Sequence, residues 1–340
     1  MLACLSLTNS TAQHQFSTNI VVDERIEILS IIQFLNNQDE PFVIDSKYKT
    51  DVLNWFEGYK EHKVVSLMKR LEKSDFYYTL AGEIGVQLEF VNQKFSTKGL
   101  VSSANLEISE SQLDSLIFEL NDFSNKSSFF KFRLNQIDNY KNWINQLTDS
   151  ITSPYLCELS TYVMSKKNLI IHLNPLNCWG AYNVLCNDSI YSKENIIINW
   201  GFNDINYEGA DLQPYFAAEW NLENTLWHEV LHSYVNPWVN NNINKLPIDK
   251  IDHIRRSSSI YFEYTPKGAL SEYIVRAYVV ALTRNLLGDK SANFELEKQL
   301  SKFGFDISNL EDRIHLMSNN NRTISGFLNQ NFANILDEIQ

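Results

Sequence analysis

Residues 226–237 read Leu-Trp-His-Glu-Val-Leu-His-Ser-Tyr-Val-Asn-Pro, a largely apolar stretch with two histidines four positions apart. In an α-helix, residues four apart lie on the same face, so the two imidazoles would stand side by side. The apolar neighbours indicate a largely buried helix, in which polar side chains need partners. We expect this helix to run from Pro214, which suits a first helical turn, to Asn236, with Pro237 as its stop.

His228 and His232 can offer two nitrogen ligands to one metal ion, and Glu229 lies beside them. Zinc in proteins takes nitrogen, oxygen or sulfur ligands in a near-tetrahedral shell, with one position open in catalytic sites. Zinc makes water a nucleophile near neutral pH and polarises a carbonyl, and Glu229 would take the proton of that water. The pattern predicts a catalytic site with one Zn²⁺ per chain. Two ordinary polar histidines on a helix are the alternative.

A third ligand is needed, and the best candidate is Glu272, on a helix expected over 268–287. No histidine follows His232 at the spacing of the metzincins, so the third ligand must be more distant. Glu263 and His253 are the alternatives. Glu272 is otherwise a first-turn glutamate that pairs with Arg276 one turn later, and Arg276 could equally hold a ligating Glu272 in orientation.

Further residues are candidates for the same site. Catalysis of this kind needs a group that stabilises the charge of the transition state, and Tyr278, Tyr264 and His253 are eligible. Asn236 either contacts the site or caps the end of the helix, and we favour the cap. A strand expected over Ala181–Cys186 is either an edge strand to which a peptide could add itself or an ordinary core strand.

The remaining pattern predicts an α+β fold, mainly helical, with a small mixed sheet before the helix that carries the histidines. Apolar residues recur at helical spacing in four N-terminal segments: Asp23–Leu35, Thr50–Leu71, Ser111–Phe123 and Phe132–Leu147. Short runs rich in Ile, Val and aromatic residues predict three strands: Asn168–Leu173, Ala181–Cys186 and Asn195–Trp200.

The end of the chain and its division into domains follow from the same pattern. After Gly288 we expect two helices, the second over Ser325–Ile339. The sequence contains no internal repeat and no long linker. We therefore expect one continuous domain, with a helical N-terminal part over 20–150 and a catalytic part over 155–340.

The charge and the apolar segments of the sequence indicate which partners the protein can bind and where in or outside the cell it acts. A net charge of −12 disfavours binding to nucleic-acid phosphates, and no apolar run is long enough for a membrane helix. The apolar start Met1–Leu7, followed by small residues at 10–12, predicts that residues 1–12 are the remnant of a signal peptide, so export to the periplasm, surface or medium is expected. Cys178 and Cys186 are near enough for a disulfide across a turn, and the sequence leaves that pairing open.

The motif His-Glu-x-x-His with a distant glutamate resembles the gluzincins, a group of zinc peptidases. Three segments are also similar to an uncharacterised bacterial family with a domain of unknown function, regarded as zinc peptidases: DERIEILS at 23–30, HEVLHSYVNP at 228–237 and EYIVRA at 272–277. They occur in matching order and span most of the chain. The forty residues from His232 to Glu272 exceed the interval in several better-known gluzincins.

The resemblance implies a zincin-like catalytic part in which His228, His232 and Glu272 bind zinc and Glu229 is the catalytic base. It also implies export, and it points to no particular substrate. The expected function is a zinc-dependent peptidase that hydrolyses peptide bonds of a peptide or protein substrate with a metal-activated water. A non-catalytic binding module on the same scaffold and a metal-dependent hydrolase of a non-peptide amide or ester are the alternatives.

Overall fold

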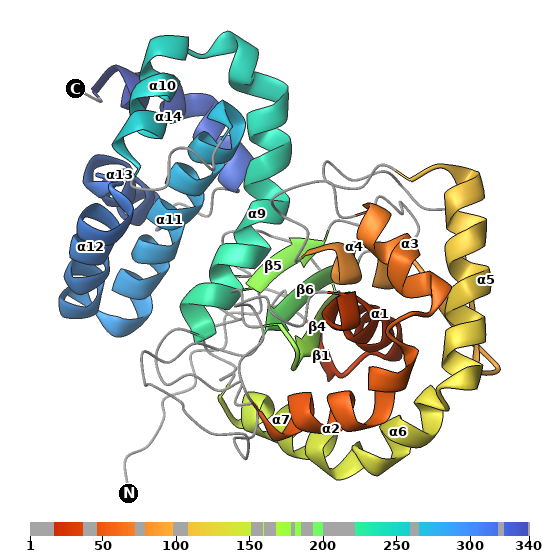
Figure 1. Cartoon of the computed structure of the whole chain (residues 1–340). Helices are drawn as coiled ribbons and strands as arrows, with labels where there is room; N and C mark the ends of the chain where they lie inside the picture. The colour runs from red at the N-terminus through yellow and green to blue at the C-terminus, as the bar shows by residue number, and fades with distance from the viewer. Residues whose placement is uncertain are drawn as a thin grey trace, which may run out of the picture.

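The computed structural model describes the following parts of the 340-residue chain: residues 17–36, 46–71, 79–97, 108–150, 159, 168–177, 181–184, 193–199, 222–258, 265–318 and 323–338. Among them helices predominate, beside one four-stranded sheet and one short hairpin (Figure 1), so the predicted α+β class is confirmed. The expected signal segment over residues 1–12 and the cysteines 178 and 186 lie outside the described residues. No described helix has the length and apolar character that a membrane span requires.

The four-stranded sheet is mixed, with the strand order β1–β4–β6–β5. Strands β1 (Ser17–Val21), β4 (Asn168–Asn174) and β6 (Lys193–Asn199) are parallel, and β5 (Ala181–Val184) runs antiparallel to β6. The three predicted strands are therefore present, and β5 lies at an edge of the described sheet. Strand β1 was not predicted, because its first three residues are polar and give no apolar run. A separate hairpin joins β2 (Glu89–Val91) to β3 (Lys94–Ser96).

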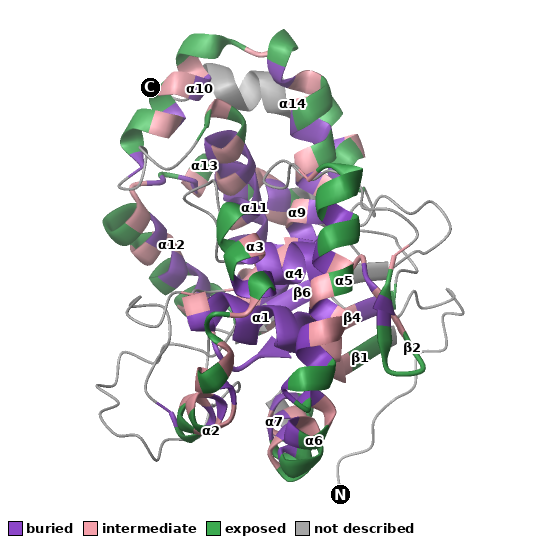
Figure 2. Ribbon diagram, turned by 45° about the vertical axis from the view of Figure 1, so that its right-hand side comes forward, coloured by how far each residue is buried: buried purple, intermediate pink, exposed green. Residues whose placement is uncertain are grey.

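Helix α1 (Glu24–Asn36) follows β1 and lies in the interior of the N-terminal part (Figure 2). Every residue from Ile26 to Leu35 is buried, because other helices and the sheet surround α1. At Gly85 a Cβ atom would come within 2.7 Å of the Ile26 side chain, so this glycine permits the close approach of the two helices. The helices around α1 are α2 (Lys47–Phe56), α3 (Lys63–Leu71), α4 (Leu80–Gly85), α5 (Glu110–Lys126), α6 (Phe129–Asn135) and α7 (Ile137–Ser150) (Figure 1).

Two helices predicted as continuous are broken in the structure. The helix predicted over Thr50–Leu71 ends at Phe56, and a 3₁₀ turn, η1 (Glu57–Tyr59), leads into α3. The helix predicted over Phe132–Leu147 is divided into α6 and α7 at Gln136. In both cases the helices on either side of the bend bury their apolar residues in the same core. The apolar spacing therefore continues across the bend and does not reveal it.

The C-terminal helices pack around α11 (Figure 1). They are α9 (Leu222–Asn242), η3 (Ile243–Lys245), α10 (Ile248–Ser257), α11 (Pro266–Leu287), α12 (Asp289–Phe303), α13 (Ser308–Ser318) and α14 (Ile324–Glu338). Thr265 begins α11 by accepting a hydrogen bond from the Gly268 N–H (3.1 Å), and the helix predicted over 268–287 is confirmed. The prediction of two helices after Gly288 was wrong. Among the described residues there are three, because Gly304 takes a left-handed conformation (φ 74°) and ends α12.

The prediction that Pro237 ends the histidine-bearing helix was also wrong. Helix α9 continues through Pro237 to Asn242. Proline lacks the N–H that the helix would use and typically costs about 3 kcal/mol in a helix interior. Packing beyond the proline offsets this cost: Trp238 and Val239 are buried, and the Trp238 indole donates to Oδ1 of Asn329 on α14 (2.7 Å).

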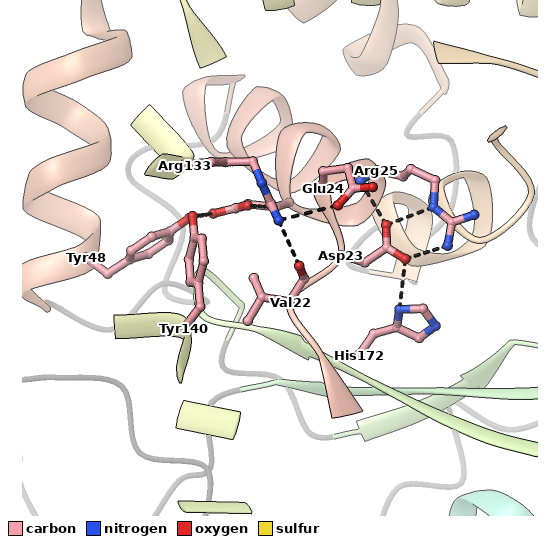
Figure 3. Close-up of polar contacts among 9 residues, drawn as sticks. Val22, Asp23, Glu24, Arg25, Tyr48, Arg133, Tyr140 and His172 are labelled. Carbon is pink, nitrogen blue, oxygen red and sulfur yellow. Dashed lines mark hydrogen bonds and ion pairs between the residues drawn. The ribbon is translucent and has the colours of Figure 1, made fainter. Parts of the chain in front are cut away.

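The segment after β1 is held by a buried ion pair (Figure 3). Asp23 accepts hydrogen bonds from the backbone N–H of Arg25 (2.9 Å) and from its guanidinium, while the Nδ1 atom of His172 on β4 lies 3.3 Å from the same carboxylate. Arg25 also donates to the carbonyl of Leu88 (2.7 Å). Burial alone would raise the pKa of Asp23, but the bonds from Arg25 and His172 outweigh it and hold the pKa well below its usual range.

The Glu27 carboxylate, one turn further along α1, is a second buried junction. It accepts hydrogen bonds from the hydroxyls of Tyr48 on α2 and Tyr140 on α7 and from the guanidinium of Arg133 on α6. Arg133 also donates to the carbonyl of Val22 (3.0 Å) (Figure 3). A buried carboxylate is stable only when it is paired and hydrogen-bonded. Glu27 therefore joins α1 to α2, α6 and α7, whereas Asp23 and Arg25 tie the start of α1 to β4 and to Leu88.

Candidate metal centre

Helices α9 and α11 pack against each other and bring three of the predicted site residues together. The Nε2 atoms of His228 and His232 are 3.0 Å apart. The Glu272 carboxylate lies 3.5 Å from Nε2 of His228 and 3.3 Å from Nε2 of His232. The i,i+4 pair and a glutamate forty residues later thus converge on one point, as the sequence predicted.

These distances suit a zinc ion. Two ligands held about 2.0–2.1 Å from a tetrahedral ion lie about 3.3 Å from each other. The two Nε2 atoms are 3.0 Å apart, Oε1 of Glu272 is 3.3 Å from His232 and Oε2 is 3.5 Å from His228, and all three distances lie close to this value. Two imidazoles and one carboxylate are also the ligand set of one class of catalytic zinc sites. The residues present therefore fit the predicted metal.

Asn236 contacts the site and does not cap the helix, so the favoured prediction for this residue was wrong. Its Oδ1 atom lies 3.1 Å from Nδ1 of His232 on the same face of α9. An amide oxygen only accepts, so Nδ1 carries the hydrogen and Nε2 is directed at His228 and Glu272. Ligating histidines commonly have such a partner on the second ring nitrogen.

Arg276 pairs with Glu272 across one turn of α11, as predicted. Its Nε donates to Oε2 of Glu272 (2.9 Å). The other carboxylate oxygen, Oε1, is the one nearest to His232. Arg276 therefore engages Oε2, which also lies 3.5 Å from His228, and leaves Oε1 toward His232.

Glu229 is buried between α9 and the edge strand β5. The backbone N–H of Asn183 on β5 donates to the Glu229 carboxylate, and the Asn183 amide donates to Oγ of Ser233 (2.9 Å). Burial raises the pKa of Glu229 to about 8, although His232 and the Asn183 N–H act in the opposite direction. Sequence reasoning missed Asn183, since nothing within its strand distinguishes this residue before β5 is placed against α9.

The three candidate ligands influence one another's ionisation. Burial lowers the pKa of His228 to about 4, although Glu272 opposes this shift. Burial also acts to lower the pKa of His232, but the hydrogen bond and charge of Glu272 outweigh it and raise the pKa to about 9. Burial would raise the pKa of Glu272, and the neighbouring His228, His232 and Arg276 instead hold it well below its usual range. Glu272 therefore contributes a negative charge on which a cation can be held.

The structure does not bring every predicted residue to this point. Tyr278 is buried on α11 with its ring against Phe327 of α14 (6.2 Å between centroids), and His253 is exposed on α10. Neither belongs to the group of candidate ligands. Glu263 and Tyr264 lie outside the described residues.

A second group of possible ligands, His62, Glu119 and Asp122, lies between α3 and α5. Its chemistry suits a cation less well. The ammonium of Lys126 is 2.7 Å from Asp122, so a positive charge is already present. The Nδ1 atom of His62 accepts the N–H of Val64 (3.2 Å), which leaves the hydrogen of the neutral ring on Nε2, the atom that faces Asp122 at 3.0 Å.

Comparison with known proteins gives a family for this chain. No curated protein and no solved structure matches it. A family model described as "Domain of unknown function (DUF4932)" matches residues 18–325, which include β1, the charged segment after it, α9 and α11. Since this match covers most of the chain, the protein belongs to the DUF4932 family.

Proposed function

We propose that this chain is a zinc-dependent peptidase of the gluzincin type, with a zincin-like catalytic part. The observation that carries the proposal is the convergence of His228, His232 and Glu272 at the spacing of ligands on one tetrahedral ion. Glu229, one residue along from the first histidine, supplies the base that hydrolysis needs. We further propose, from the apolar Met1–Leu7 segment, that the protein acts after export.

Each residue has a distinct role in this proposal. A zinc ion held by the two histidines and Glu272 would polarise the scissile carbonyl and activate the attacking water. Glu229 takes the proton of that water and delivers it to the leaving amine. Its buried position beside Asn183 keeps the carboxylate next to the point where the three ligands meet. Asn236 and Arg276 keep His232 and Glu272 in orientation.

The position of β5 favours a peptide as the substrate. This strand lies at an edge of the described sheet, and it contacts α9 beside the histidine motif. An extended peptide can add itself to such an edge through backbone hydrogen bonds. A bound peptide bond would then lie close to Glu229, whose carboxylate already accepts a backbone N–H from this strand.

The test combines metal analysis with one isosteric variant. The purified protein should contain one zinc per chain. Glu229→Gln should retain zinc and fold, whereas its cleavage of a peptide library should fall about 10²-fold or more, the usual contribution of a general base. Glu83→Gln, at another buried glutamate on α4, is the matched control and should cleave as the wild type does.

Two results would refute the proposal. Wild-type protein that neither contains zinc nor takes it up has no zinc centre. Zinc-loaded protein that cleaves peptides equally well with Glu229→Gln has a different base. A zinc-loaded wild type that cleaves no peptide in the library would instead direct the search to a binding role or to non-peptide amides and esters.

A further inference from the structure

We propose that Gln299 on α12 is a positioning residue for Glu272 and acts through Arg276. The inference rests on the proposed zinc site and extends it to a helix that carries none of the candidate ligands. The Nη1 atom of Arg276 donates to Oε1 of Gln299 (2.7 Å), while Nε of the same guanidinium donates to Oε2 of Glu272 (2.9 Å). One rigid, planar group thus bridges the candidate ligand and Gln299.

Gln299 is itself fixed. Its amide donates to Oε1 of Glu295 one turn earlier on α12 (2.6 Å), and both side chains are only 4% exposed. Buried polar groups that lose their partners cost about 1–3 kcal/mol each. Gln299 therefore keeps its oxygen toward Arg276, because a rotation would break two hydrogen bonds inside the protein.

Aromatic rings hold the guanidinium from the side. Its central carbon lies 4.2 Å from the ring centroid of Phe303, the last residue of α12, and 5.5 Å from that of Phe305. A guanidinium over an aromatic face is attracted to the ring and loses rotational freedom. Arg276 is thus held in place by a hydrogen bond to Gln299 and by contacts with the rings of Phe303 and Phe305.

The consequence concerns the geometry of Glu272. With Arg276 fixed, Oε2 of Glu272 is held 3.5 Å from His228, and Oε1 faces His232 at 3.3 Å. Ligands that must be placed within a fraction of an ångström depend on such support. The packing of α12 against α11 therefore sets the orientation of the carboxylate, and a change at Gln299 is transmitted to the site through Arg276.

The test measures zinc affinity of the full-length chain by competition with a chromophoric chelator, together with the melting temperature of each apo protein. Gln299→Met should weaken zinc binding about 10–100-fold, the usual effect of removing a partner of a metal ligand. Arg276→Met should weaken it at least as much. The double variant should be no weaker than Arg276→Met alone, because Gln299 acts only through Arg276.

Arg284 provides a matched control on the same helix. It is an equally enclosed arginine of α11 that pairs with Glu311 (2.8 Å) and makes no contact with the candidate ligands. Arg284→Met should lower the melting temperature but leave zinc affinity unchanged. The exchange variant Glu295→Gln with Gln299→Glu keeps an acceptor for Arg276 and a donor beside it, so it should restore zinc affinity to within a few-fold of wild type.

The outcomes separate this inference from the proposed function. A wild type without zinc overturns both. A wild type that binds zinc, with a Gln299→Met variant of equal affinity, overturns the positioning role alone. So does a double variant whose fold-loss of zinc affinity is the product of the two single fold-losses. If Gln299→Met does not fold, Gln299→Asn decides in the same way, since it keeps a buried amide but withdraws it from Arg276.

Discussion

The Nδ1 atom of His232 lies 3.1 Å from the side-chain oxygen of Asn236, one turn further along α9. Because this oxygen can only accept, the pair fixes which ring nitrogen carries the hydrogen and turns the other toward Glu272. The contact exists because α9 is helical from His232 to Asn236, which places the two side chains on the same face. The orientation of a candidate ligand is thus tied to the continuity of this helix.

Asn236→Ala should lower zinc affinity about 10–100-fold, because the His232 ring loses the partner that holds its tautomer and orientation. Asn236→Asp should retain most of the affinity, since a carboxylate also accepts from Nδ1. Asn242→Ala is the control, because that amide donates to the carbonyl of Trp238 (2.8 Å) near the end of the same helix. Equal affinities for the alanine variants at 236 and 242 would contradict the role of the contact.

Removal of the third ligand should have a larger effect. Glu272→Ala deletes the only carboxylate in the group formed with His228 and His232, so zinc affinity should fall by more than the ~100-fold upper range for an indirect partner. Glu263→Ala, at the glutamate that the sequence left as an alternative, should retain zinc. Chelator competition on both variants gives the comparison. Loss of zinc from the Glu263 variant alone would move the ligand to that residue.

Pro237→Ala tests how much the proline inside α9 lowers the stability of the protein. Alanine restores the missing N–H and is favoured over proline in a helix interior by about 3 kcal/mol, part of which local relaxation has already recovered. We therefore expect the free energy of unfolding to rise by about 1 kcal/mol or more, seen in urea titrations. Pro247 precedes α10 in an extended conformation, and Pro247→Ala should bring no such gain. A destabilised Pro237→Ala would contradict a net cost of the proline at this position.

Asp23 should contribute to acid denaturation. Its pKa in the folded protein is depressed, whereas a free aspartate titrates at about 3.9. The stability that Asp23 contributes is therefore complete above about pH 4 and is lost progressively as the pH falls from there toward the depressed pKa of the folded state. Urea midpoints measured from neutral pH downward should drop less steeply for Asp23→Asn than for wild type. The exposed Asp249 provides the control, because Asp249→Asn should leave the slope unchanged.

The sequence predicted correctly those contacts that depend only on residues close together in the chain. Two histidines four residues apart meet on any helix, so their pairing needed no knowledge of the fold. Glu272 was a harder prediction, because its place beside them depends on α9 packing against α11. It was identified from its apolar surroundings and from the resemblance to a known motif. Gln299 could not be predicted, since only the packing of α12 on α11 brings its amide to Arg276.

Three of the wrong predictions share one physical cause. Pro237 was interpreted as a stop because proline disfavours a helix locally, and the packing of Trp238 and Val239 outweighed this preference. Asn236 was then interpreted as a cap. The bend at Gln136 was missed for a related reason: the spacing of apolar residues shows which side chains are buried, but it does not show where the helix axis changes direction. Tertiary contacts, which a local pattern does not contain, decided all three.

Strand β1 pairs in parallel with β4, so that Ser17 lies opposite Asn168. Pairings between residues so distant in sequence raise the contact order of a protein and slow its folding, because the long loop must close before the contact contributes. The contacts of α1 with α3 and α4 span much shorter loops and can form earlier. During synthesis β1 cannot pair until β4 has been made, and we therefore expect the sheet whose edge strand supports Glu229 to be completed late in folding.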